Sequence, residues 1–246
     1  PVTLIAAGWK CRRDAGLSSS LTKGKIDGRR LGLGCVAALF FYSVCQLLSY
    51  LWQVLFGSMG LPAATIPTVN WALGDPWMTL LLTVFISPVV EEWLFRGAIL
   101  NRLRPYGDRF AVVASALCFG LFHGNLNQYF YAFAIGLVLG YVALRTGLIW
   151  QNILLHAMIN FISVGLLPLL ETLGDLGTSL LAVLVLGAIF LGIVFLAALR
   201  RELRFDPGSV SLSAGWKWRV FFENPGILCF CLLSLALCAS YLLPGV

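Results

Sequence analysis

Long apolar runs alternate with short polar segments along most of the chain. We expect membrane-spanning helices over residues 33–56, 78–103, 110–123, 127–144, 148–170, 179–199 and 226–243. Several of these runs approach or exceed the roughly 20 apolar residues that cross a bilayer as a helix. The pattern therefore predicts an all-α, polytopic membrane helical bundle with about seven transmembrane helices.

The composition supports this prediction. Of the 246 residues, 59% are hydrophobic and 11% are charged, and the mean hydropathy is +0.89. Such a chain has too few polar side chains to cover a water-soluble globule. We expect residues 1–246 to form a single integral membrane domain, because neither residues 1–32 nor residues 200–225 can bury a core of their own. The seven cysteines are scattered, without the paired CxxC spacing of a zinc or redox site.

The positive charges alternate between the loops. Residues 1–32 contain seven Lys or Arg, and further basic residues fall in segments 96–109 and 200–223 and at Arg145, whereas the other loops have none. Since cytoplasmic loops are enriched in Lys and Arg, we predict a basic cytoplasmic segment over residues 1–32 and a C-terminus on the opposite side. The net charge of +6 thus reflects topology. It indicates membrane lipids as partners and no nucleic acid.

Two adjacent glutamates interrupt the second apolar run. Glu92 and Arg96 are four residues apart, which places them on one helical face in the favourable order for a structural ion pair. Glu91 points about 100° away and has no partner at that spacing. A carboxylate in a membrane helix is costly, so Glu91 is the stronger candidate for chemistry.

The two histidines of the chain, His123 and His156, also lie in apolar runs. A single histidine in a helix is more often a packed residue than a catalyst. At about 1.5 Å per residue, however, Glu91 and His123 lie at the same distance from the turn that joins their helices. Asn160 reaches a similar level from the next hairpin, and His156 lies one turn nearer the cytoplasm.

A carboxylate, two imidazoles and a carboxamide at similar depth suit peptide hydrolysis. A carboxylate held away from bulk water is a usable general base, so Glu91 is expected to activate a water molecule that His123 holds. His156 and Asn160 are expected to donate hydrogen bonds to the oxyanion of a tetrahedral intermediate. Neither the GxSxG motif of serine hydrolases nor the HExxH motif of zinc proteases occurs.

Three motifs carry a family resemblance: EEWLFR reads as EExxxR, FGLFH as FxxxH and HAMIN as HxxxN. In this order they resemble the CAAX prenyl-endopeptidase and bacteriocin-processing family of intramembrane glutamate-dependent proteases. The resemblance covers about residues 78–165, which would be the catalytic core helices. It implies Glu91 as base, His123 as its water-positioning partner, His156 and Asn160 as the oxyanion site, and Glu92, Arg96 and Phe119 as supporting residues.

The resemblance also implies the substrate class and location. We expect a membrane-associated protein or peptide, possibly lipidated, of the prenylated-tail, bacteriocin or sorting-signal type. The compact chain suggests a prokaryotic cytoplasmic (inner) membrane.

Other interpretations remain open at this stage. We expect no cofactor, although Glu91, His123 and His156 would make three zinc ligands with an open fourth position. A non-catalytic membrane adaptor or immunity protein of the same fold would keep the motifs without chemistry. A small proton-coupled transporter would use the buried Glu and His as a proton path.

Overall fold

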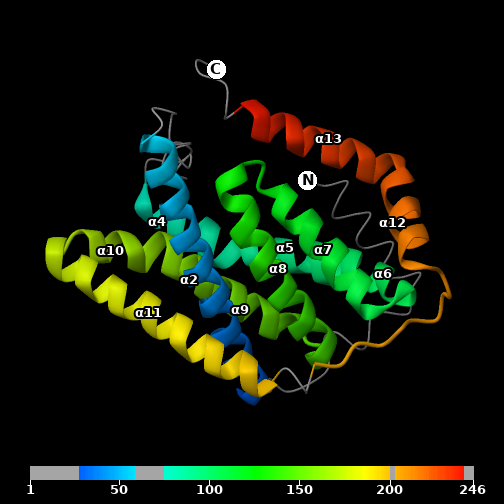
Figure 1. Cartoon of the computed structure of the whole chain (residues 1–246), viewed down its shortest axis with the longest axis horizontal. Coiled ribbons are helices and arrows are strands. Elements are labelled where there is room, and N and C mark those ends of the chain that lie inside the picture. Colours follow the sequence, from blue (N-terminus) through cyan, green and yellow to red (C-terminus); the bar gives the residue numbers. More distant parts are fainter. Residues whose placement is uncertain (1–27, 59–74, 200–202, 241–246) are drawn as a thin grey trace.

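The computed structural model describes residues 28–58, 75–199 and 203–240, and every regular element in these ranges is helical (Figure 1). The first helix, α2, runs over Gly28–Ser58. Helix α2 thus begins five residues before the predicted span, within the segment predicted as a basic tail. Residues 1–27, the rest of that tail, lie outside the described ranges.

The second predicted span is one continuous helical stretch with changes of helical register. It consists of α4 (Pro76–Leu80), the π-helix η1 (Leu81–Ile86), α5 (Ser87–Glu92), the π-helix η2 (Trp93–Leu100), α6 (Asn101–Leu103) and the 3₁₀ turn η3 (Arg104–Tyr106). Asp75 caps its start by accepting a hydrogen bond from the backbone N–H of Trp77. The two π-helical stretches flank the segment that carries Glu91 and Glu92.

The middle of the bundle is an antiparallel pair, α7 (Asp108–Phe122) and α8 (Leu126–Thr146). Its close packing depends on glycine, as small-xxx-small spacing predicts. A Cβ on Gly136 would lie 3.1 Å from the Cα of Ala116, and one on Gly140 would lie 3.2 Å from Val112 Cγ1. Larger residues there would push the two helices apart.

The fifth predicted span again changes register. It comprises α9 (Ile149–Phe161), the π-helix η4 (Ile162–Leu166) and α10 (Leu167–Glu171), and α11 (Gly174–Leu199) follows it. In Figure 1, α10 and α11 meet at the left edge, and α11 then runs back along α2. Helices α2 and α9 also pack against α8, whose Leu139 is fully buried.

The segment 200–223 departs from its predicted loop, because α12 occupies Ala214–Glu223. Ser213 accepts a hydrogen bond from the N–H of Trp216 at the start of this helix, and Trp218 packs edge-on against Phe110 at 4.9 Å between ring centroids. In the sequence, the basic residues of this segment suggested a cytoplasmic loop, so the helix and its aromatic face were not predicted. After a 76° bend, α13 (Pro225–Ser240) covers most of the last predicted span.

The protein is a multi-pass helical membrane protein. Five helical segments in the described ranges are long and apolar enough to cross a bilayer, and α12 with α13 would make a sixth. The predicted number of seven is not confirmed, because α7 has 15 residues and extends only about 22 Å, less than the roughly 30 Å of a bilayer core.

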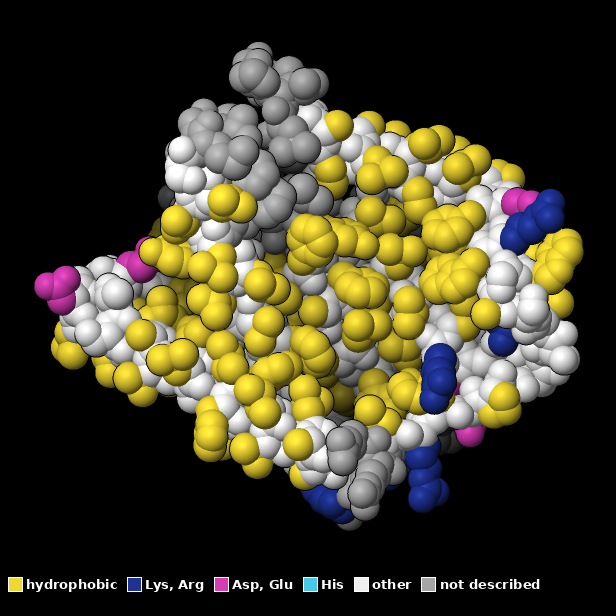
Figure 2. All heavy atoms as spheres, in the orientation of Figure 1, with side chains coloured by type: hydrophobic (Ala, Val, Ile, Leu, Met, Phe, Trp, Pro, Cys, Tyr) yellow, Lys and Arg dark blue, Asp and Glu magenta, His cyan; other side chains and the backbone are white. Residues whose placement is uncertain are grey.

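The surface has the character expected of a membrane protein. Apolar side chains cover most of the face in Figure 2, and Lys and Arg gather along its lower and right edges. Among the exposed residues of α11 are Val183, Leu186 and Phe190, each at least 64% accessible. Lipid tails are the surroundings that tolerate such exposure. The cytoplasmic position of the N-terminus stays a prediction from the charge pattern.

Candidate active site

A buried ion pair lies at the centre of the candidate site. Arg96 Nη1 is 2.9 Å from Glu92 Oε1, and the two side chains are 1% and 0% exposed. The spacing of four residues predicts this pair. A second guanidinium nitrogen, Nη2, donates to the carbonyl of Gly136 at 3.3 Å, and the guanidinium also lies 4.4 Å from the ring centre of Phe119. The pair therefore ties η2 to α7 and α8.

Glu92 also holds a histidine and an amide from α9. Nδ1 of His156 lies 2.9 Å from Glu92 Oε1, and Asn152 Nδ2 donates to Glu92 Oε2 at 3.2 Å. Because a carboxylate only accepts hydrogen bonds, the proton of a neutral His156 ring belongs on Nδ1. The other ring nitrogen, Nε2, then faces Glu91, with 3.8 Å between it and Oε2.

Only one of the two carboxylate oxygens of Glu91 has a hydrogen-bond partner. The hydroxyl of Ser87, one helical turn earlier, donates to Glu91 Oε1. The second oxygen, Oε2, is buried without a hydrogen-bond partner. The partner of Glu91 thus lies one turn before it, a position that the sequence reasoning did not consider.

The buried side-chain polar atoms without a hydrogen-bond partner all belong to this cluster, as far as the structure describes the chain. They are Glu91 Oε2, Arg96 Nε and Asn152 Oδ1. Unpaired polar atoms are rare in protein interiors, since each one costs about 1–3 kcal/mol. Their concentration around Glu91 and Glu92 marks this place as a site for a polar ligand.

His123 ends α7 beside this cluster. Its Nδ1 lies 2.9 Å from the carbonyl oxygen of Phe119, which places the proton of a neutral ring on Nδ1 and leaves the lone pair of Nε2 as an acceptor. Phe119 contacts both histidines edge-on, with ring centroids 5.1 Å from His123 and 5.5 Å from His156. His123 is close enough to Glu91 and His156 to interact with both electrostatically.

Asn160 has a different partner. Its Nδ2 donates to the backbone carbonyl of Thr83 at 2.8 Å. In the π-helical register of η1, the N–H of Ser87 bonds to Leu82, so the carbonyl of Thr83 would pair with residue 88. Residue 88 is proline and has no N–H. Asn160 therefore satisfies an orphaned carbonyl, and one of its two N–H donors is already used.

The structure thus joins most of the predicted residues directly. His156 contacts Glu91 and Glu92, and Phe119 links both histidines to Arg96. No hydrogen bond within the described residues connects Asn160 to either glutamate. Sequence reasoning missed Ser87 and Asn152, although each lies four residues before a predicted site residue and so shares its helical face.

The alternative zinc set fits the geometry poorly. In the described ranges, no three His, Cys, Asp or Glu side chains converge as metal ligands, and this includes Glu91, His123 and His156. A zinc site requires its nitrogen and oxygen ligands to lie about 2.0–2.2 Å from one point.

Asn152 gives a direct test of this network. Replacing it with leucine removes the donors to Glu92 Oε2 and to the carbonyl of Leu139, which it reaches at 2.6 Å. Leaving these buried acceptors unpaired should lower the free energy of unfolding by about 2–4 kcal/mol. Unfolding of the purified protein in mixed micelles, followed by circular dichroism during SDS titration, would measure the change.

The control is Asn224→Leu, because Asn224 is exposed and caps α13 through the N–H groups of Gly226 and Ile227. Losing an N-cap costs about 1 kcal/mol. Equal destabilisation by the two variants would contradict the structural role given to Asn152.

The fold and this cluster define a multi-pass helical membrane protein with a buried site of carboxylates and imidazoles. Residues 73–162 match the family model described as Type II CAAX prenyl endopeptidase Rce1-like, which confirms the resemblance seen in the three motifs. The matched region contains every residue of the cluster.

One curated relative is the Bacillus subtilis (strain 168) protein named "Putative membrane peptidase YdiL". It is 29% identical over 84 residues, and the match covers 34% of this chain and 34% of the relative. The matched part of this chain therefore spans about a third of the relative's length. No solved structure matches the chain.

Proposed function

We propose that this protein is an intramembrane endopeptidase in which Glu91 activates the water that hydrolyses a peptide bond. The observation that carries the proposal is the buried Oε2 of Glu91, which has no hydrogen-bond partner and faces Nε2 of His156 at 3.8 Å. A water molecule or a substrate group is the natural partner for such an atom. The match to the endopeptidase family over residues 73–162 supports the reaction class.

The first step is attack by water. The lone pair of His123 Nε2 accepts one hydrogen bond from the water, and Glu91 takes the other proton as the water oxygen bonds to the peptide carbonyl carbon. Ser87 holds the second oxygen of Glu91, so the basic oxygen keeps a fixed direction. The electron pair of the carbonyl moves to its oxygen.

The second step is collapse of the tetrahedral intermediate. The free N–H of the Asn160 amide and Nε2–H of His156 donate to the oxyanion. Since Nδ1 of His156 is bonded to Glu92, its Nε2 can donate only when the ring is an imidazolium. The C–N bond then breaks, and Glu91 returns its proton to the leaving amine. One water is consumed, and a carboxyl group and an amine are formed.

The proposed substrate is a protein or peptide presented at the membrane, of the prenylated-tail, bacteriocin or sorting-signal type. The apolar exterior supports access from the lipid phase. The relative from Bacillus subtilis supports placing the protein in a prokaryotic cytoplasmic membrane.

Terminal-peptide mass spectrometry of membrane proteins tests the proposal. Cells producing the wild-type chain are compared with cells producing Glu91→Ala at matched levels, with Glu171→Ala, exposed at the end of α10, as the control. We expect one or a few termini to be present with the wild type and with Glu171→Ala and absent with Glu91→Ala. If no terminus changes while the cells keep the phenotype that the wild type confers, the adaptor hypothesis replaces the protease.

Metal removal provides a separate prediction. We expect cleavage by the purified protein to proceed at the same rate, within twofold, after dialysis against a zinc chelator, because the described side chains form no three-ligand site. The rate would be measured with and without added zinc. Loss of activity on dialysis that returns with stoichiometric zinc would contradict the glutamate mechanism.

A further inference from the structure

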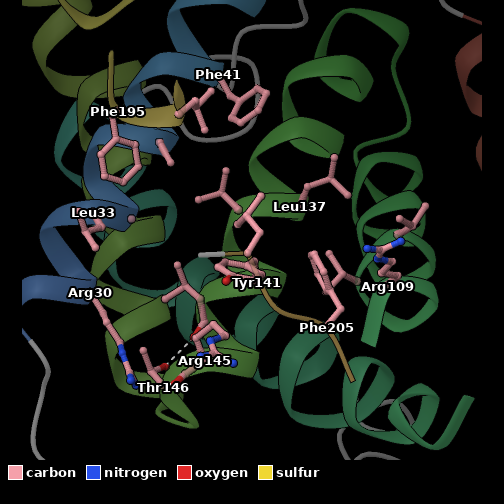
Figure 3. A pocket seen from close by; sticks show the side chains of 18 of the residues that line it. Arg30, Leu33, Phe41, Arg109, Leu137, Tyr141, Arg145, Thr146, Phe195 and Phe205 are labelled. Carbon is pink, nitrogen blue, oxygen red and sulfur yellow. Dashed lines mark hydrogen bonds between the residues drawn. The ribbon is translucent and has the colours of Figure 1, made fainter. Parts of the chain in front are cut away.

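A cavity lies apart from the candidate active site. Its volume is about 780 Å³, and it is lined by α2, α7, α8, α11 and the segment around Phe205 (Figure 3). This volume falls within the range of about 300–1,000 Å³ typical of small-molecule sites. No residue of the glutamate and histidine cluster lines it.

Helix α8 presents different residues to the two sites. The carbonyls of Gly136 and Leu139 bond to Arg96 and Asn152 of the active-site cluster. Leu137 and Tyr141, by contrast, line the cavity. The cavity is therefore separate from the place where the scissile peptide would bind.

The cavity has a charged end and an apolar end. Arg30, Arg145 and Thr146 gather at one end in Figure 3, whereas Phe41 and Phe195 lie at the other. The guanidinium of Arg30 donates to the backbone carbonyl of Arg145 at 2.5 Å, which holds the start of α2 against the end of α8. Such a division of polarity matches a molecule with a charged head and a hydrocarbon tail.

The charge of the lining has one sign. Four arginines line the cavity, and the lining contains no Asp or Glu: the four are Arg29, Arg30, Arg109 and Arg145. Across the described ranges, Arg29, Arg109 and Arg145 form no ion pair with an acidic side chain. Asp108, beside Arg109 in the sequence, is instead engaged by Arg104 at 3.5 Å. The charged end therefore favours an anion.

The position of the arginines matches the level of lipid headgroups. Arg29 and Arg30 begin α2, Arg109 lies in the first turn of α7, and Arg145 lies in the last turn of α8. Helix ends that carry basic side chains mark the border between hydrocarbon and headgroups. Basic pockets between transmembrane helices at this border bind the headgroups of anionic lipids.

We propose that this cavity binds one anionic phospholipid from the leaflet on the arginine-bearing side. Its phosphate lies at the end where Arg30 and Arg145 gather, with the positive charge of Arg109 across the cavity beside Phe205. An acyl chain extends towards Phe41 and Phe195 between α2 and α11. The proposal rests on the cavity and its charges and is independent of the proteolytic function.

Native mass spectrometry tests it with phosphatidylglycerol titrated into the detergent-purified full chain. The wild type should retain one phosphatidylglycerol in preference to phosphatidylcholine. The double variant Arg109→Gln/Arg145→Gln should bind it about thirtyfold more weakly, since each basic residue near a membrane surface contributes roughly fivefold. Leu137→Trp keeps every charge but fills the cavity, and it should also lose the lipid.

The matched control is Arg102→Gln/Arg204→Gln, which removes the same charge at exposed positions outside the cavity lining. It should bind phosphatidylglycerol within threefold of the wild type. Equal weakening by this control, or equal retention of phosphatidylcholine, would overturn the proposal. So would displacement of the lipid by free glycerol phosphate at the concentrations at which the lipid itself binds, because the headgroup alone would then account for the site. If the arginine double variant elutes as an aggregate in gel filtration, Leu137→Trp decides the question.

Discussion

Replacing Glu91 with glutamine is expected to slow peptide hydrolysis by about a hundredfold to ten-thousandfold, the usual contribution of a general base. Glutamine has nearly the same shape, and its carbonyl can still accept the hydrogen bond from Ser87. It cannot, however, take a proton from water. The measurement is the cleavage rate of a peptide that spans the terminus identified in cells, with purified wild-type and variant proteins in the same detergent.

The control for this experiment is Glu171→Gln, which changes the same atoms at an exposed position. It should cleave at the wild-type rate, and both variants should unfold at the same SDS concentration as the wild type. A Glu91→Gln protein that is folded and cleaves within tenfold of the wild-type rate would rule out Glu91 as the base.

Replacing Arg96 with methionine is expected to lower the free energy of unfolding by about 3–5 kcal/mol, because it leaves a buried carboxylate without its charge partner. Arg96 and Glu92 are 1% and 0% exposed and lie 2.9 Å apart, so water cannot replace the lost interaction. SDS titration followed by circular dichroism would give the loss. The double variant Glu92→Gln/Arg96→Met should recover part of it, since no unpaired charge then remains.

The chain contains a matched control for this pair. Arg219 and Glu223 are also four residues apart and are joined at 2.7 Å, but their side chains are 61% and 58% exposed. Exposed pairs contribute about 0–1 kcal/mol, so Arg219→Met should have little effect. If Arg96→Met and Arg219→Met destabilise the protein equally, burial does not determine the contribution of the Glu92–Arg96 pair.

The helices were largely predictable from the apolar runs. Within the described residues, the seven predicted ranges fall on helices apart from single residues at their ends, because a run of apolar residues in a bilayer must satisfy its backbone hydrogen bonds internally. Residues 241–243 of the last range lie outside the described residues. Helix α12 was missed, since its basic residues resembled a cytoplasmic loop and its aromatic face packs against Phe110 of a distant segment. The π-helical stretches were also missed, because a change of register has no simple pattern of residue types.

The candidate site was predictable only where its contacts are local. The Glu92–Arg96 pair follows from a spacing of four residues, and the same rule applied to Ser87 and Asn152 would have found two further members. The contact of His156 with both glutamates joins residues more than 60 positions apart. Depth counted from the turns placed His123 and Glu91 near one level and His156 one turn away, but such counting does not predict which side chains are in contact, because it ignores tilt and register changes.

The sequence by itself determined that this chain is a helical membrane protein. With 59% hydrophobic and 11% charged residues, it has too few polar side chains to cover its surface in water. It also indicated which polar side chains are costly to place inside a membrane and are therefore candidates for function. Only the tertiary structure decided which residues of distant segments are paired: Glu92 with His156 and Asn152, and Asn160 with the carbonyl of Thr83. Such pairings depend on the rotation of each helix about its axis, which packing between distant segments sets.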